Sequence, residues 1–169
     1  MRTAFVGASV LLVFVASDVS LGNVCRTENI PPVTPGVRFV VSASNKEVKD
    51  TLTRLAWQRC PLGMMWDAGK CTGVAKTYTW QQALQEAQAL GNGWRLPNVK
   101  ELSSIVERAC QLPAINEDIF PGTPGAVFWA GTPAAARADS AWAVDFADGS
   151  SSYDKKTSYH YVRLVKDAE

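Results

Sequence analysis

The sequence predicts an α+β fold in which two helices pack on short antiparallel strands and disulfides stabilise the domain. Two helical patterns lie next to each other in the middle of the chain, short apolar segments lie on both sides of them, and four cysteines follow an apolar N-terminal segment. The length of 169 residues suits a single domain. The net charge of +1 gives no overall field that would capture nucleic acid, so we expect no nucleic-acid partner.

Residues 1–22 have the pattern of a secretory signal peptide. Arg2 supplies the positive start, and the apolar run 4–16 has 13 residues, whereas a spanning helix needs roughly 20. The small residues Ser20 and Gly22 favour cleavage after Gly22. We therefore expect an exported protein, which is periplasmic, on the cell surface or secreted, without membrane insertion after cleavage. The alternative is an N-terminal anchor that is not cleaved.

The mature chain is expected to begin with a proline-rich arm, residues 23–36, whose prolines favour extended backbone. Residues 37–41 form a short apolar run that predicts a strand, and the polar residues 45–50 predict a turn. Buried, extended backbone is expected at three apolar positions beyond them: Leu52, Leu55 and Trp57.

The four cysteines of an exported chain predict disulfides, because oxidising compartments favour them. Three pairings are possible and spacing alone does not choose among them. The most local pair is Cys60 with Cys71, whose loop contains a proline and two glycines that let the chain reverse, and this pairing leaves Cys25 for Cys110. Closing such a loop stabilises by about 3 kcal/mol. The alternative is a four-cysteine zinc site, although the sequence lacks the Cys-x-x-Cys pairs typical of one.

Two amphipathic helices are predicted in the centre of the chain. Residues 79–90 form the first, with Thr79 as the N-cap and Gly91 as the stop. The second begins at Asn98, which has capping-box spacing to Glu101. The expected inner face of the first helix is Trp80, Ala83, Leu84, Ala87 and Leu90. That of the second is Val99, Leu102, Ile105, Val106 and Ala109.

The C-terminal half has the pattern of short strands separated by loops. We expect strands at residues 127–129, 142–146 and 159–165, and loops at residues 111–126, 130–140 and 147–160. Asp148 precedes a glycine and signals a turn, and we expect Asp145 and Asp148 to cap it rather than to act as a catalytic carboxylate pair.

The candidate ligand-binding residues lie in the last two of these loops, since binding residues often lie on loops between strands. They are Arg137, Tyr153, Asp154, Lys155, Lys156, Tyr159 and His160. Aromatic rings with polar and basic groups suit a sugar or a protein surface, and lysines can meet sulfate or carboxylate groups as point charges. With one histidine and no Gly-x-Ser-x-Gly motif, we expect no catalytic residue, no cofactor and no metal site.

The six tryptophans invite the hypothesis of sugar stacking, but their positions favour burial for five of them. These five are Trp57, Trp80, Trp94, Trp129 and Trp142. Trp66 lies in the loop between Cys60 and Cys71 and is expected to be the most exposed.

Several motifs in the same order along the chain resemble a known family. Residues 94–102 read Trp-Arg-Leu-Pro-x-x-x-Glu-Leu, and this string resembles the family named for the C-terminal domain of the Legionella collagen-like protein, the Lcl C-terminal domain. Within the motif, Glu101 is expected to cap the second helix and Arg95 to bond nearby carbonyls. The motif residues singled out are Trp94, Arg95, Leu96, Pro97 and Glu101. Further matches in order are Asp50, Thr53, Leu55, Trp57 and Gln58, then Thr79, Trp80 and Ala83, then Phe128, Trp129 and Thr132, then Ala141, Trp142, Val144, Phe146 and Gly149, then Val162, Arg163 and Val165.

The resemblance implies a C-type-lectin-like fold over residues 37–169, export and a binding role. We expect a non-catalytic module that recognises an extracellular glycan, including an anionic one, or a surface protein. The calcium-binding triplets of sugar-binding C-type lectins do not occur in this sequence, so no calcium site is expected. One alternative is a structural or assembly subunit of a pilus or cell envelope. Another is a formylglycine-type enzyme, which the Arg-Leu-Pro motif suggests and the lack of a cysteine after Cys110 opposes.

Overall fold

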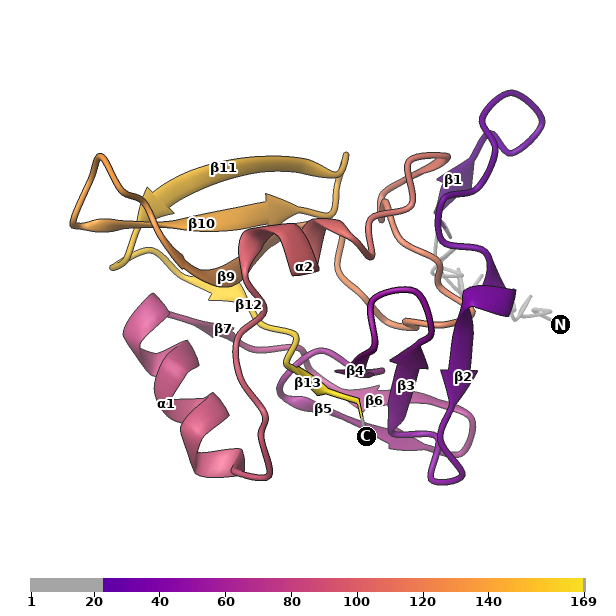
Figure 1. Cartoon of the computed structure of the whole chain (residues 1–169), viewed down its shortest axis with the longest axis horizontal. Coiled ribbons are helices and arrows are strands. Elements are labelled where there is room, and N and C mark those ends of the chain that lie inside the picture. The colour runs from indigo at the N-terminus through magenta and orange to yellow at the C-terminus, as the bar shows by residue number, and fades with distance from the viewer. Residues whose placement is uncertain (1–22, 169) are drawn as a thin grey trace, which may run out of the picture.

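The computed structural model describes residues 23–168 and shows an α+β domain with two helices, several antiparallel sheets and two disulfides (Figure 1). The α+β prediction is confirmed, and the more specific C-type-lectin assignment stays a prediction. The signal peptide predicted for residues 1–22 lies outside the described residues. Across residues 23–168, no helix has the length and apolar character that crossing a bilayer requires.

The strands form two larger sheets and two two-stranded pairs. The five-stranded sheet has the order β11-β10-β9-β12-β7, the four-stranded sheet has the order β13-β4-β3-β2, and β1 pairs with β8 and β5 with β6. The strands are β1 (Val24–Cys25), β2 (Phe39–Val41), β3 (Glu47–Asp50), β4 (Leu55–Gln58), β5 (Met64–Asp67), β6 (Lys70–Gly73), β7 (Thr77–Tyr78), β8 (Cys110–Gln111), β9 (Val127–Pro133), β10 (Ser140–Asp145), β11 (Ser150–Lys155), β12 (His160–Tyr161) and β13 (Val165–Asp167). A single 3-10 turn, Gly36–Arg38, precedes β2.

The first helix, α1 (Trp80–Leu90), has the predicted limits. Thr79 and Gln82 form a capping box, in which the Gln82 N–H donates to Thr79 Oγ1 at 3.3 Å and the Thr79 N–H donates to Gln82 Oε1 at 2.9 Å. Gly91, with a φ of 64°, ends the helix. The buried stripe is narrower than predicted, because Leu84 and Leu90 are exposed by more than a third of their surface.

The second helix, α2 (Val99–Ser103), begins as predicted with a capping box between Asn98 and Glu101. Its predicted length is wrong, because the helix ends after five residues. Ser103 Oγ donates to the carbonyl of Val99 at 2.8 Å, and Ser104 Oγ donates to that of Glu101 at 2.7 Å. These serine hydroxyls bond to carbonyls three or four residues earlier and so compete with continuation of the helix. The predicted inner residues beyond it are buried in irregular backbone: Ile105, Val106 and Ala109.

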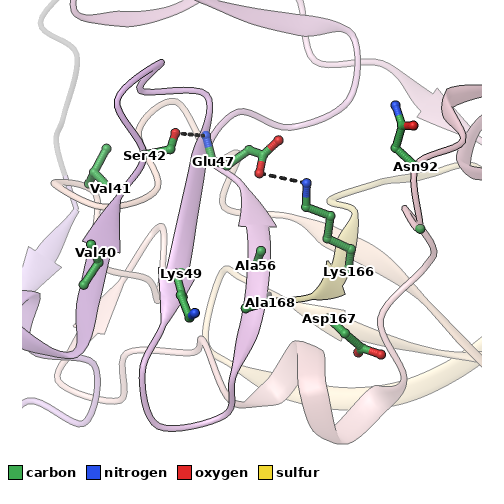
Figure 2. Close-up of a pocket in the computed structure, with 11 residues that line it drawn as sticks. Val40, Val41, Ser42, Glu47, Lys49, Ala56, Asn92, Lys166, Asp167 and Ala168 are labelled. Atoms are coloured by element: carbon green, nitrogen blue, oxygen red, sulfur yellow. Dashed lines mark hydrogen bonds and ion pairs between the residues drawn. The ribbon is translucent and has the colours of Figure 1, made fainter.

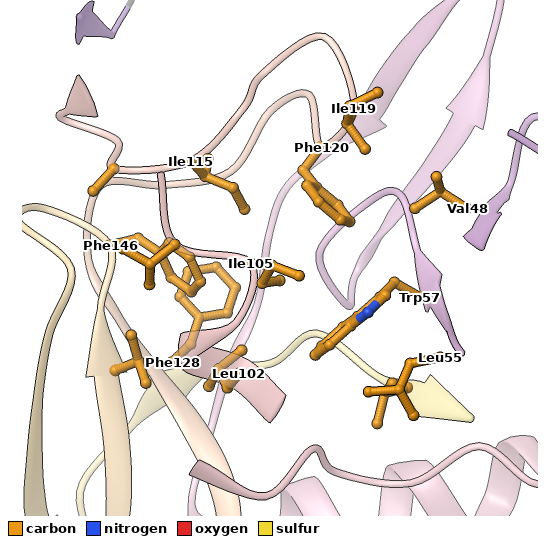
Figure 3. Packing of buried hydrophobic residues seen from close by; sticks show 14 of the residues in the cluster. Val48, Leu55, Trp57, Leu102, Ile105, Ile115, Ile119, Phe120, Phe128 and Phe146 are labelled. Atoms are coloured by element: carbon orange, nitrogen blue, oxygen red, sulfur yellow. The ribbon is translucent and has the colours of Figure 1, made fainter. Parts of the chain in front are cut away.

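Strand β9 contributes to two cores on its opposite faces. Phe128 lies in a larger core with Leu102 of α2, and Trp129 lies in a smaller core with Ala83 of α1. Because neighbouring strand residues point to opposite faces, the two helices cover opposite sides of the five-stranded sheet. Trp57 of the four-stranded sheet also packs in the larger core, which therefore joins the two sheets (Figure 3).

Several segments predicted as turns or loops are strands. Residues 45–50 contain β3, residues 130–140 contain the end of β9, and residues 147–160 contain β11. These strands are rich in polar or small residues, so they lack the apolar alternation that would have indicated them. Conversely, Leu52 is not in a strand but in an exposed turn, where its N–H donates to Asp50 Oδ1 at 3.0 Å.

The predicted turn at Asp148 is confirmed as the connection between β10 and β11. Asp145 Oδ1 accepts from the Ala147 N–H at 2.8 Å, and Asp148 Oδ1 accepts from the Ser150 N–H at 2.8 Å, as their expected capping role requires. Gly149 adopts a φ of 80°, and a side chain there would lie 2.5 Å from Val106 Cγ1. Only glycine fits this position without strain.

Both predicted disulfides are present, Cys60–Cys71 and Cys25–Cys110, and the described residues contain no free cysteine. The zinc alternative is therefore wrong. Cys25 and Cys110 are also register partners in the β1–β8 pair, so a covalent bond and a strand pair attach the N-terminal arm at one place. The disulfides indicate an oxidising, extracytoplasmic location.

The prediction that five tryptophans are core residues is only partly confirmed. Trp57 and Trp129 are fully buried. The other three predicted core tryptophans, Trp80, Trp94 and Trp142, are half-buried, as is Trp66. Trp80, Trp94 and Trp142 lie at the margins of the two cores, where a large ring contacts the core with only one part of its surface.

The buried carboxylate of Glu107 fixes the end of the N-terminal arm, a role that was not predicted from the sequence. Glu107 accepts hydrogen bonds from the Thr34 N–H and Oγ1, both at 2.7 Å, from the Val33 N–H at 3.2 Å and from the Ala109 N–H at 3.0 Å. Burial acts to raise the pKa of Glu107, but these bonds to the ionised form outweigh it and lower the pKa below its ordinary value.

We expect the Glu107→Gln variant to lose about 2 kcal/mol or more of unfolding free energy, because the amide presents N–H donors to the N–H groups of the arm. Because the pKa of Glu107 is lowered in the folded state, its contribution to the unfolding free energy is fully present above the unfolded-state pKa of about 4.3. That contribution is lost as the pH falls through the folded-state pKa. Urea unfolding between pH 7 and pH 3 should therefore show a weaker pH dependence in Glu107→Gln than in the wild type. Glu28→Gln, an exposed change in the same arm, is the control. Equal pH dependence of wild type and Glu107→Gln would contradict this role.

Candidate functional site

The structure divides the seven predicted ligand-binding residues among three places. Arg137 lies in the loop between β9 and β10, and its guanidinium carbon lies 5.1 Å from the centre of the Tyr153 ring. Tyr153 lies on β11 opposite Trp142 of β10, and the two rings pack edge to face with centres 5.6 Å apart. Arg137, Trp142 and Tyr153 therefore form one group on one face of the β10–β11 hairpin.

The next residue of β11 points to the opposite face, because side chains alternate along a strand. Asp154 Oδ2 lies 2.9 Å from His160 Nε2 of β12, and Asp154 Oδ1 accepts from the Lys155 N–H at 2.7 Å. Burial acts to raise the pKa of Asp154, but the hydrogen bonds from Lys155, Ser158 and His160 outweigh it and lower the pKa. His160 also packs against Trp129, with ring centres 4.4 Å apart.

Lys156 and Tyr159 lie beside the N-terminus of α1 and line an open groove of about 570 Å³. We call it the Trp80 groove; its lining residues are Thr79, Trp80, Gln81, Leu84, Lys156, Thr157 and Tyr159. Tyr159 is 62% exposed and Leu84 is 37% exposed, so aromatic and aliphatic surface is accessible there. Of the predicted ligand-binding residues, only Lys156 and Tyr159 line this groove.

The groove has a fixed geometry because its side chains are bonded to the backbone around them. Trp80 Nε1 donates to the carbonyl of Ala130 at 2.9 Å, which anchors the indole to β9. The Lys156 ammonium donates to the carbonyl of Ala138 at 2.6 Å and lies 4.7 Å from the centre of the Trp80 ring. The Trp80 N–H also donates to the Lys156 carbonyl at 3.1 Å, so α1 and the segment after β11 are directly joined.

Sequence reasoning did not find the four groove residues that come from the start of α1: Thr79, Trp80, Gln81 and Leu84. Helical spacing predicted that Trp80 and Leu84 are inner residues of the helix, whereas Trp80 is half-buried and Leu84 is exposed in the groove. The groove depends on a tertiary contact that the sequence pattern does not show. Strand β12 pairs with β7, and this pairing brings Tyr159 next to the residues that precede α1.

A second depression, of about 820 Å³, lies over the outer face of the four-stranded sheet (Figure 2). Val40, Lys49, Ala56 and Lys166 are successive cross-strand partners on this face. The Lys166 ammonium lies 2.9 Å from Glu47 Oε2 and 4.6 Å from the centre of the Trp94 ring. The face is a mixture of aliphatic and paired charged groups and contains none of the predicted ligand-binding residues.

In the Trp-Arg-Leu-Pro motif, Glu101 caps α2 as predicted, but the close partner of Arg95 is a carboxylate rather than a carbonyl. Arg95 makes a two-point ion pair with Glu101, at 2.7 and 2.9 Å. Glu101 also accepts from the Asn98 N–H at 2.7 Å, so one carboxylate caps α2 and orients the arginine. The pKa of Arg95 is raised by the hydrogen bond to Glu101, which favours its charged form. These bonds join the residues before α2 to its first turn.

Comparison with known families gives one match. The model of the Lcl C-terminal domain family matches residues 46–166, which include both helices, the Cys60–Cys71 disulfide and the Trp80 groove. No curated protein matches the chain.

Within the described residues, no group of three or more His, Cys, Asp or Glu side chains is placed to hold a metal ion. We expect saturating calcium to leave the Tm of the protein unchanged, because calcium needs a cluster of six to eight oxygen ligands. Thermal unfolding with calcium and with a chelator tests this expectation. Magnesium is the control for a general salt effect, and a rise in Tm that only calcium produces would contradict the prediction.

Proposed function

This chain belongs to the Lcl C-terminal domain family, and from that premise we propose that it is a non-catalytic, extracytoplasmic module that binds a glycan through the Trp80 groove. The supporting observation is the juxtaposition, in one open groove, of the exposed Tyr159 ring, the Trp80 ring and the Lys156 ammonium.

A carbohydrate suits this combination of groups. Sugars present C–H faces that pack on aromatic and aliphatic surface, which Tyr159 and Leu84 offer. They also present hydroxyls that need donors and acceptors, and the groove is lined by the hydroxyl residues Thr79 and Thr157 and by the amide residue Gln81. The anchored indole of Trp80 makes the groove pre-organised, which lowers the entropy cost of binding.

An anionic sugar is favoured over a neutral one by the lysines at this end of β11. The Lys156 ammonium lies within the groove, and exposed Lys155 is the preceding residue. A sulfate or carboxylate on the sugar would meet these point charges at a surface, where salt screens the attraction. Binding that weakens as salt rises is therefore part of the proposal.

The absence of catalysis is also a proposal. The imidazole Nε2 of His160 lies 2.9 Å from Asp154, and the ring packs on the buried Trp129, so it is positioned as a structural residue of β12. All four cysteines form disulfides. A formylglycine-type mechanism, which needs a reactive thiol, gains no support from this arrangement.

We expect Tyr159→Ala and Lys156→Met to weaken binding to immobilised heparin, a sulfated glycan, by about tenfold each. Methionine keeps an apolar stem against Trp80 while it removes the charge, so Lys156→Met separates the loss of charge from the loss of packing. Surface plasmon resonance at several salt concentrations measures both effects. The difference between wild type and Lys156→Met should shrink at high salt.

Tyr153→Ala is the matched control, because Tyr153 is 44% exposed but lies outside the Trp80 groove. Desulfated heparin tests the requirement for the anionic group. Unchanged affinity in Tyr159→Ala would refute the groove as the binding site, and equal binding of the desulfated glycan would refute the anionic preference.

A second candidate function, assembly with other subunits, is favoured by one observation. Strand β11 lies at the edge of the five-stranded sheet, and five of its six residues are exposed. The Lys156 N–H donates to the Asp139 carbonyl at 2.8 Å, so the backbone groups of the even-numbered residues face β10. The backbone N–H and C=O groups of Ser151 and Tyr153 consequently face outward, where an added strand could pair with them.

A second copy of the chain is a suitable partner for this edge. In an antiparallel pair of β11 strands centred on Ser152, Asp148 of one copy would lie opposite Lys156 of the other. Opposite charges across an antiparallel pair are favourable. Lys156 also lines the Trp80 groove, so self-association through β11 would engage a residue that the proposed glycan site uses.

If β11 pairs with a second copy, Tyr153→Pro should weaken dimerisation by about tenfold, because proline removes an outward N–H and leaves the inward bonds of its neighbours. Light scattering after size exclusion, over a range of protein concentrations, measures the association. Tyr153→Ala is the control, since it keeps the N–H. A wild type that stays monomeric at high concentration, or a Tyr153→Pro variant that dimerises like the wild type, would exclude this assembly.

A further inference from the structure

The first described residue, Asn23, is hydrogen-bonded through both its backbone and its side chain. Its backbone nitrogen donates to Glu117 Oε2 at 3.1 Å, and its Nδ2 donates to the carbonyl of Ile115 at 3.0 Å. Both partners lie 92 or more positions further along the chain. Asn23 therefore has a defined position on the folded domain, next to β1 and the Cys25–Cys110 disulfide.

The surroundings of this nitrogen are acidic. Asn23 lines a small pocket of about 220 Å³, in which the titratable side chains are Glu107, Glu117 and Asp118. Glu107 is engaged with the arm through Val33 and Thr34. Glu117 accepts from the Asn23 nitrogen, and Asp118 is exposed. The pocket has the charge that suits a cation at the position of the Asn23 nitrogen.

The sequence supplies that cation if the predicted processing occurs. While a residue precedes Asn23, its nitrogen is a neutral amide. Hydrolysis of the Gly22–Asn23 peptide bond, with water as the co-reactant, leaves a carboxylate on Gly22 and an ammonium on Asn23. The hydrogen bond to Glu117 then joins two opposite charges, and such bonds are shorter and roughly twice as strong as neutral ones.

We propose that the mature chain begins at Asn23 and that Glu117 is a receptor for its α-ammonium, so that removal of the leader strengthens the attachment of the N-terminal arm. The arm needs such bonds, because all of residues 24–33 are exposed and provide little hydrophobic burial. Its other attachments include the disulfide, the β1–β8 pair and the bonds to Glu107. The processed chain is then more stable than the same chain with its leader residues attached.

The first test is the mass of the protein that a producing cell exports, which should correspond to a chain that starts at Asn23. The second compares two chains released from a fusion partner without extra residues, one that starts at Asn23 and one that keeps Leu21 and Gly22. We expect the longer chain to have a Tm lower by about 1–3 °C at pH 7. In Glu117→Gln, the two chains should have equal Tm values, because the cation has lost its partner.

The pH dependence provides a readout that a purely steric effect would not show. An ion pair raises the pKa of the α-ammonium above its ordinary value of about 7.7–8.0, so the extra stability is present below that range and is lost as the pH rises through the folded-state pKa. The Tm difference between the two chains should therefore disappear near pH 10. Export of a chain with another N-terminus, or an equal Tm difference in wild type and Glu117→Gln, overturns the proposal.

Discussion

The buried closing segment, residues 162–165, joins the two large sheets, and the positions of the other elements depend on it. It runs between β12 and β13, and none of its four residues has exposed surface. Buried backbone must be hydrogen-bonded, and the carbonyls of this segment accept from the backbone of Gln58 and Leu62 at 3.1 and 2.9 Å. Val165 exchanges two further backbone bonds with Arg95. The strand-to-helix motif, the disulfide loop and the groove-bearing sheet are thereby fixed relative to one another.

Arg163, within this segment, provides the polar part of the junction. Its guanidinium donates to the carbonyls of Gln58 and Arg59 and, at 2.6 Å, to Thr123 Oγ1. It also lies over the ring of Phe120, 4.9 Å from its centre. Burial lowers the pKa of Arg163 to about 9, and the neighbouring Arg59 acts in the same direction, yet the group remains charged at neutral pH. Two carbonyl dipoles at the end of β4 and the hydroxyl of Thr123 compensate this charge, so the charge is stable only when both segments are in place.

The parts of the fold that could be predicted are those indicated by residues close to one another in the sequence. The capping residues Thr79 and Asn98 marked the starts of both helices, because a cap and its partner lie three residues apart. The polar strand β11 had no such signal, and without it the alternation that places Tyr153 and Asp154 on opposite faces was not predictable. The sequence therefore indicated residues suited to binding but did not show which of them lie on the same surface. Glu107 was missed for a related reason, since its arm partners lie more than 70 positions away.

The tryptophans show how the fold itself produces a composite surface. Helical spacing assigned Trp80 to the core, but the ring lies at the margin of the smaller core, where the Lys156 ammonium lies 4.7 Å from its centre. Trp94 and Lys166 repeat this arrangement at 4.6 Å on the other large sheet. A lysine can cover apolar surface with its alkyl stem while its charge stays in water. A ligand that contacts such a ring must therefore contact the cation as well. Pairs of aromatic and basic groups at the surface thus arise because lysines cover the rings that the small core cannot enclose.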